Sequence, residues 1–340
     1  MSAWLLLGFG LGPAALGVLT SDVLAHLDAA VSVGLGTLGV FVGLALVPRA
    51  RGAAPLVGAA LIESGSAVAI VFGATAFLLT AQRVPLTSPM LLVALSLGAA
   101  AGASSASASF DGQHHDGHHA PHVADLDDVL PIVVAAAAAG FAGTTGPNWI
   151  TATVLPIIIG VACGTIGLLL FERTTGAAER AVYVLGVLAL IGGSCAYAGV
   201  SPLLAGLCAG VFWRNMPGRA DAVIGGDLRK FQHLLVVLLV VVAGAQTIVG
   251  PLPLLLFVTF VVFRLSGKVI GGLCAARVAP TLAGEVLGAY LVSPGVIGIA
   301  IALNVHQIAP AAGSAVISAT AAGALVFDVL STVVSPAEPA

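Results

Sequence analysis

Long apolar runs fill this chain, and short connectors rich in charged residues, proline and glycine separate them. A membrane-spanning helix needs about 20 such residues, so each run predicts one span. The pattern predicts twelve helices, at residues 3–20, 29–47, 55–81, 88–109, 121–144, 150–171, 180–197, 201–213, 231–249, 252–275, 281–306 and 310–333. These helices form three blocks, 3–109, 121–213 and 231–333, separated by the two longest connectors, residues 110–120 and 214–230, which leave no room for a soluble domain. We therefore expect an all-α polytopic membrane protein with a single transmembrane domain and no soluble regulatory domain.

Composition strengthens this interpretation. Hydrophobic residues make up 59% of the chain and charged residues only 8%, whereas about 25% is usual in soluble domains. The first 20 residues have no basic start and no clear cleavage site, which favours a first span over a removable signal. The four cysteines lie in apolar runs without metal-site spacing, and we interpret them as small core residues: Cys163, Cys195, Cys208 and Cys274.

Basic residues are distributed unevenly between alternate connectors. One set of connectors contains nine of them, and the other set contains only Arg83. The nine are Arg49, Arg51, Arg173, Arg180, Arg214, Arg219, Arg229, Lys230 and Arg277. Because lysine and arginine favour cytoplasmic loops, this asymmetry predicts that both termini and residues 110–120 are cytoplasmic.

A few ionisable residues lie inside the predicted spans, where each would cost about 2.5–3.5 kcal/mol or more if unpaired. They are Glu63, Asp127, Asp128, Arg264, Lys268, Glu285 and Asp328. Glu285 and Asp328 lie near helix ends, and we expect their side chains to reach water. Such residues usually mark ion or proton pathways, so the others are candidates for a transport site.

The predicted helix boundaries place an acid and an amine at one depth. If the fifth helix begins at Pro121, Asp128 lies about 10 Å inward at 1.5 Å per residue. Lys268 lies about as far from the end of the tenth helix near Ala275. Asp127 and Asp128 point about 100° apart, so one can face Lys268 and the other an aqueous funnel. We expect Asp128 and Lys268 to pair when no cation is bound.

Two segments beside these charged helices disfavour continuous helix. GASSASAS, residues 102–109, has three serines that can bond to freed backbone groups, Ser104, Ser105 and Ser107. A proline interrupts the eleventh helix within Ser293, Pro294 and Gly295. Secondary transporters often place their sites where two helices break in corresponding positions of inverted repeats. The alternative is that the small residues serve only close helix packing.

Several segments, taken in order, carry a family resemblance. They are LGFGLGPAALGVL (7–19), GASSASAS (102–109), DDVLPIVV (127–134), YAGVSPLLAGLCAGVFWRN (197–215), FRLSGKVIGG (263–272) and GAYLVSPGVIGIAIALN (288–304). Together they resemble the monovalent cation/proton antiporter superfamily, and within it the bacterial sodium/proton or potassium/proton antiporters, which are sodium/hydrogen exchanger-like proteins. The similarity extends over nearly the whole chain.

This resemblance implies a fold and a mechanism. It implies two inverted repeats with broken helices 4 and 11, and a mobile core that moves like an elevator against a dimer or scaffold part. The expected partners are Na+ or K+, protons, the lipid bilayer and a second copy in a homodimer, with no cofactor and no nucleic acid. The expected location is a bacterial-type inner (plasma) membrane, and the expected exchange is electrogenic.

The resemblance also implies roles for individual residues. Asp127 and Asp128 become the cation and proton site, and Lys268 becomes the basic partner that pairs with an aspartate. Ser104 and Ser105 become hydroxyl or backbone ligands where the broken helices cross. Carboxylate, hydroxyl and carbonyl oxygens are the hard ligands that a hard alkali cation needs.

A histidine cluster in residues 110–122 suggests other functions. It comprises His114, His115, His118, His119 and His122, with Asp111 and Asp116 among them. Imidazole suits zinc, nickel and cobalt, so a divalent metal transporter or a metal-regulated antiporter is an alternative. The simpler interpretation is a solvated, pH-sensitive loop without metal. A transport-inactive membrane subunit or sensor is a third alternative, whereas the lack of nucleotide loops and catalytic triads argues against an enzyme.

Overall fold

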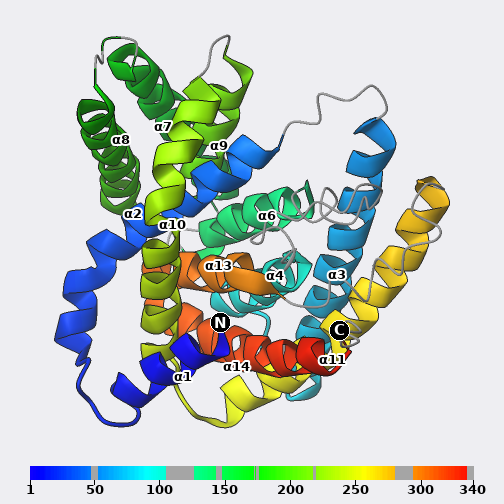
Figure 1. Cartoon of the computed structure of the whole chain (residues 1–340). Coiled ribbons are helices and arrows are strands. Elements are labelled where there is room, and N and C mark those ends of the chain that lie inside the picture. The colour runs from blue at the N-terminus through cyan, green and yellow to red at the C-terminus, as the bar shows by residue number, and fades with distance from the viewer. Residues whose placement is uncertain are drawn as a thin grey trace, which may run out of the picture.

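The computed structural model describes residues 1–46, 53–104, 126–142, 148–171, 173, 176–216, 220–279 and 294–334, and within them every regular element is a helix (Figure 1). The helices are α1 (Ser2–Leu11), α2 (Ser21–Ala45), α3 (Ala53–Ala81), α4 (Ser88–Gly102), α6 (Val129–Ala139), the 3-10 helix η1 (Gly140–Ala142), α7 (Trp149–Phe171), α8 (Ala177–Ala198), α9 (Pro202–Asn215), α10 (Ala220–Ala245), α11 (Pro251–Val278), α13 (Gly295–Ile308) and α14 (Pro310–Val334).

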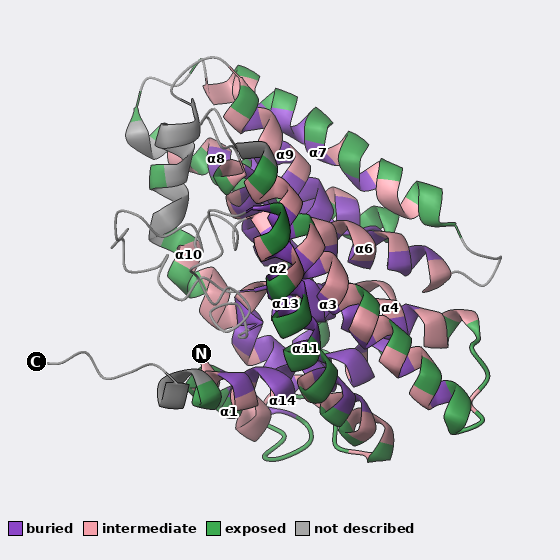
Figure 2. Ribbon diagram, turned by 90° about the vertical axis from the view of Figure 1, so that its right-hand side faces the viewer, coloured by how far each residue is buried: buried purple, intermediate pink, exposed green. Residues whose placement is uncertain are grey.

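Helix length and composition identify a multi-pass membrane protein. Within the described ranges, six helices are long and apolar enough to cross a membrane: α2, α3, α7, α8, α11 and α14. Shorter apolar helices include α1, α4, α6 and α13. Large apolar side chains such as Phe77, Tyr197 and Leu234 are exposed on the outer surface, and exposed positions recur along α7 in Figure 2. Such faces suit contact with lipid rather than with water.

Local sequence signals account for several helix ends. The Thr20 hydroxyl accepts the Val23 N–H at 3.4 Å before α2, and the Ser201 hydroxyl accepts the Leu204 N–H at 3.1 Å before α9. Prolines occupy the first turn of α4, α9 and α11, where a missing N–H removes no helical bond. Helix α8 ends at Gly199, whose φ of 64° is left-handed and favours glycine.

The helices pack in two groups. The first helix group comprises α1, α2, α7, α8, α9 and α10, and the second helix group comprises α3, α4, α6, α11, α13 and α14. Within the first, α2 and α9 pack backbone to backbone: a Cβ at Gly39 would lie 2.7 Å from the Leu207 nitrogen. Within the second, α3 packs along α11, while α4 lies against α3, α6, α13 and α14. The most extensive helix contacts are made inside each group.

The structure corrects several predicted boundaries in the first helix group. The first predicted helix, 3–20, ends as α1 at Leu11, because Gly12 and Pro13 follow and proline cannot donate a helical hydrogen bond. The second predicted helix begins at Ser21 instead of residue 29. The connector predicted at 214–230 is helical from Ala220 onward.

Boundaries around the charged helices also differ. Helix α4 ends at Gly102 rather than at residue 109, and α6 begins at Val129, after a turn at Asp128 that interrupts the helical residues 126 and 127. The chain between residues 105 and 125 lies outside the described residues, as do residues 280–293. The count of twelve spans, the inverted repeats and the single-domain organisation therefore stay predictions.

Candidate ion-binding site

Helices α3 and α11 approach each other closely enough to bring two opposite charges together. A Cβ at Gly267 would lie 2.8 Å from the Ala67 Cα, and a Cβ at Gly271 would lie 2.8 Å from the Glu63 carbonyl oxygen. Neither position therefore leaves room for a larger residue. Ser66 joins the two helices by donating to the Gly267 carbonyl at 3.1 Å. Lys268, next to Gly267, is thereby held against α3.

Lys268 is fully buried and surrounded by oxygen atoms. Its Nζ lies 3.0 Å from Glu63 Oε2 and 3.3 Å from Asp127 Oδ2, and both carboxylates are as buried as the lysine. It also donates to the Gly102 carbonyl at 2.7 Å and to the Ser104 hydroxyl at 2.5 Å. An ammonium has three donors, so these four oxygens share them. The lysine charge is thus divided between two carboxylates on different helices.

Ser104 connects the end of α4 to both aspartates. Its hydroxyl donates to Asp127 Oδ2 at 2.6 Å, and its backbone N–H donates to Asp128 Oδ1 at 3.2 Å. This N–H is free to do so because Ala103 is extended, with φ −65° and ψ 144°, so the chain has left the helix. Asp127 is 0% exposed and Asp128 is 6% exposed. Both carboxylates therefore lie inside the protein where α4 ends.

Arg264 satisfies the carbonyls at the end of α4. Its guanidinium donates to the carbonyls of Ala100, at 3.2 Å, of Ala101, and of Ala103, at 2.7 Å. The last carbonyls of a helix have no partner within the helix and carry its negative dipole end, so a buried cation is well placed there. The side chain is 0% exposed and lies between the rings of Phe260 and Phe327, with centroids at 5.8 and 5.6 Å.

The second predicted break also meets this region. Pro294 immediately precedes α13, which begins at Gly295, where φ is 58°. One turn into α13, a Cβ at Gly298 would lie 3.2 Å from the Ala100 carbonyl oxygen. The start of α13 therefore packs directly against the last turn of α4. Ser105, Ser107 and Ser293 lie outside the described residues.

The structure assigns the Lys268 ion pairs to carboxylates other than the predicted one. We expected Asp128 to pair with Lys268, whereas the two ion pairs of Lys268 are with Asp127 and Glu63. The local reason lies at Asp128, which forms a turn at the N-cap of α6 and whose carboxylate accepts the Ser104 backbone N–H. The helix start predicted at Pro121 lies outside the described residues.

Glu63 and Arg264 belong to the site; sequence reasoning included both among the candidate transport residues but assigned neither a specific role. The available signal was that both are ionisable residues inside predicted spans. No local spacing connects Glu63 to Lys268, because 205 positions separate them and only the α3–α11 contact brings them together.

The charge and hydrogen-bond balance of the site is incomplete. Among the described residues, the buried charged side chains are three acids, Glu63, Asp127 and Asp128, and two bases, Arg264 and Lys268. In addition, Glu63 Oε1 and Asp127 Oδ1 are buried without a hydrogen-bond partner. A bound proton or a small cation would be a suitable partner for these two oxygens.

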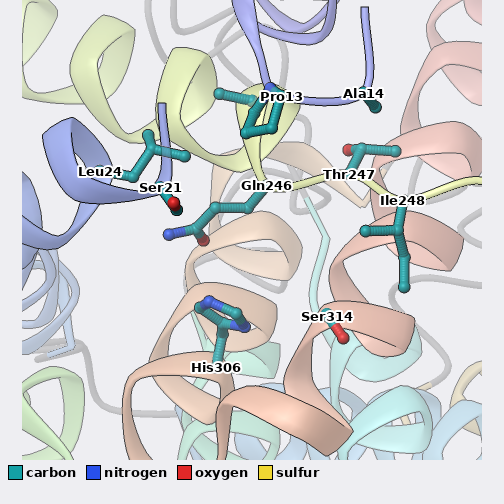
Figure 3. A pocket seen from close by; sticks show the side chains of 10 residues that line it. Pro13, Ala14, Ser21, Leu24, Gln246, Thr247, Ile248, His306 and Ser314 are labelled. Atoms are coloured by element: carbon teal, nitrogen blue, oxygen red, sulfur yellow. The ribbon is translucent and has the colours of Figure 1, made fainter. Parts of the chain in front are cut away.

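A separate cavity of about 390 Å3 lies away from this charged site. It is formed near the ends of α10 and α13, and Gln246 and His306 point into it in Figure 3. No charged residue of the site lines it. The part of the chain that the structure describes also contains no group of His, Cys, Asp and Glu suited to a metal ion. The histidines of the predicted metal cluster, at 114–122, lie outside that part.

Comparison with known proteins identifies the fold. No family model matches the chain, and no curated protein matches it in sequence. The structure is similar to the solved structure of the sodium proton antiporter MjNhaP1 from Methanocaldococcus jannaschii at pH 8, with a TM-score of 0.68 and 17% sequence identity. The match covers 98% of this chain and 89% of that chain. It confirms an all-helical fold similar to that of a sodium proton antiporter, and that neighbour is a transporter, not an enzyme.

Proposed function

We propose that this protein exchanges a monovalent cation, Na+ or K+, for protons across a membrane. The observation that carries the proposal is the buried Asp127 carboxylate, which has Lys268 on one oxygen and no hydrogen-bond partner on the other. A charged, incompletely satisfied group inside an apolar helix bundle is costly, and such groups usually mark ion or proton pathways. The fold similarity to a sodium proton antiporter supports the same function.

The site offers the right chemistry for competition between a cation and a proton. The carboxylates of Asp127 and Asp128 and the Ser104 hydroxyl are hard oxygen ligands, and Ser104 contacts both acids, Asp127 through its hydroxyl and Asp128 through its backbone N–H. The same carboxylates bind protons, so a cation and protons displace each other. Lys268 neutralises Asp127 when the cation is absent, which lowers the cost of keeping that carboxylate charged inside the protein.

Alternating access is proposed to follow an elevator-type movement of the second helix group against the first. Two features support it: the ion site lies wholly within the second group, and the most extensive contacts are made inside each group. Electrogenic exchange, a homodimer, an inner-membrane location and cytoplasmic termini complete the proposal. A two-proton, one-cation exchange would move net charge, which current recording on a solid-supported membrane detects. Equal fluxes without current would contradict the electrogenic part.

The central test is cation-driven proton movement in proteoliposomes of purified protein, with Na+, K+ and Li+ compared across pH. We expect Asp127→Asn and Asp128→Asn each to abolish exchange, because an amide retains the shape but neither releases a proton nor offers full negative charge. Asp22→Asn, an exposed aspartate in the first turn of α2, is the matched control and should exchange normally. Full activity of both site variants would refute the proposal.

The same assay tests the alternatives based on the histidine-rich segment and on an inactive subunit. Zn2+, Ni2+ and Co2+ are added as substrates and, separately, as effectors of alkali-cation exchange. Transport of a divalent cation without alkali-cation exchange would favour the metal transporter. No exchange with any cation would favour the transport-inactive subunit.

A further inference from the structure

We propose that Glu63 is a positioning residue that takes over the Lys268 ammonium when the cation binds Asp127. The proposal rests on the exchange function described above and assigns a part in it to a carboxylate outside the aspartate pair. In the structure, Lys268 already lies between both acids, 3.0 Å from Glu63 and 3.3 Å from Asp127. Transfer of the ion pair therefore needs only a small rotation of the lysine side chain.

Burial makes a second acceptor necessary. Lys268, Glu63 and Asp127 are each 0% exposed, so an ammonium released by Asp127 has no water to receive it. An uncompensated buried charge is strongly destabilising, and the neutral Gly102 carbonyl and Ser104 hydroxyl offset it only in part. Without Glu63, cation binding at Asp127 would have to overcome the remaining free-energy cost of the unpaired Lys268 ammonium.

Helix packing fixes the distance of Glu63 from Lys268 but not that of Asp127. Glu63 and Lys268 belong to α3 and α11, which are held together by close contacts at Gly267 and Gly271 and by the Ser66 hydrogen bond. Asp127 instead lies in the segment before α6 and is not part of the α3–α11 contact. Lys268 therefore retains Glu63 as a partner at a fixed distance when the surroundings of Asp127 change on cation binding.

A positioning role makes a different prediction from direct ligation of the cation by Glu63. If Glu63 acts through Lys268, Glu63→Gln leaves the ammonium on Asp127 alone and weakens cation binding by competition. The same substitution should then have no effect once Lys268 is removed. If Glu63 is itself a ligand, the loss should persist without the lysine.

The experiment is a double-mutant cycle measured as Na+ and K+ binding to the purified full-length protein by isothermal titration calorimetry. We expect Glu63→Gln to weaken binding about tenfold and Lys268→Gln to strengthen it, with the double variant binding as Lys268→Gln does. Glu179→Gln, an exposed glutamate on α8, is the matched control and should bind like the unmodified chain. Exchange assays on the same four proteins show whether binding and transport change together.

Two results would overturn the inference while leaving the proposed function intact. They are unchanged binding in Glu63→Gln, and the same tenfold loss in both lysine backgrounds. An unmodified protein that neither binds an alkali cation nor exchanges it would remove the proposed function and the inference with it. If Glu63→Gln fails to elute as monodisperse protein, Glu63→Asp replaces it, alone and combined with Lys268→Gln. This variant retains the charge but shortens the reach to Lys268, and it should weaken binding only where the lysine is present.

Discussion

Replacing Arg264 by glutamine removes the donors that satisfy three backbone carbonyls at the end of α4. Hydrogen bonds inside membrane proteins contribute on average about 0.6 kcal/mol each, so losing three sets a lower bound of about 2 kcal/mol. Removing one partner from a buried charged cluster costs up to about 5 kcal/mol, which sets the upper bound. The packing of the guanidinium between Phe260 and Phe327 is lost as well. We therefore expect a free energy of unfolding lower by about 2–5 kcal/mol.

The assay is thermal unfolding of the detergent-solubilised protein, with all variants heated at one rate. A loss of about 2 kcal/mol corresponds to a fall in Tm of roughly 3 °C or more for a chain of this size. Arg264→Lys should lose less, because the ammonium preserves the charge but cannot span three carbonyls. Ser266→Ala, an exposed position on the same helix, is the control. If Arg264→Gln melted at the same temperature as Ser266→Ala, the end of α4 would not depend on the guanidinium and the reasoning would fail.

Three further predictions follow from the site. Ser104→Ala removes the hydroxyl between Asp127 and Lys268 but preserves the backbone N–H. Cation affinity in calorimetric titrations should therefore fall a few-fold, which is on the order of one hydrogen bond. An unchanged affinity would exclude the hydroxyl as a ligand. Gly271→Leu should force α3 and α11 apart and abolish exchange, whereas Gly73→Leu, with open space around it, should preserve activity in the same liposome assay. Because protons and the cation compete for carboxylates, the KM for the cation should rise as pH falls, by about tenfold per pH unit where the site is mostly protonated. A KM independent of pH would contradict competition at one site.

Sequence reasoning was most successful where local patterns decide the outcome. Apolar run length alone located most of the helices, and α7, α11 and α14 have nearly the bounds that the runs predict. The end of α4 near the serine-rich stretch and the start of α13 at Pro294 were also indicated by residue type. Two kinds of boundary error arose. Helix α10 begins in polar residues before its apolar run, and a turn after α1 interrupts the first apolar run.

The sequence by itself determined that this is a membrane protein with ionisable residues in its apolar helices, because an apolar run and a charge within it are visible without knowledge of neighbours. It also singled out Ser104, Asp127 and Lys268 as candidate site residues. Only the tertiary structure decided which charges meet. The glycine-mediated approach of α11 to α3 places Lys268 beside Glu63, and the turn at Asp128 leaves Asp127 rather than Asp128 paired with it. A pairing between residues about 140 or 205 positions apart depends on helix contact and register, to ångström accuracy, and no local pattern encodes these.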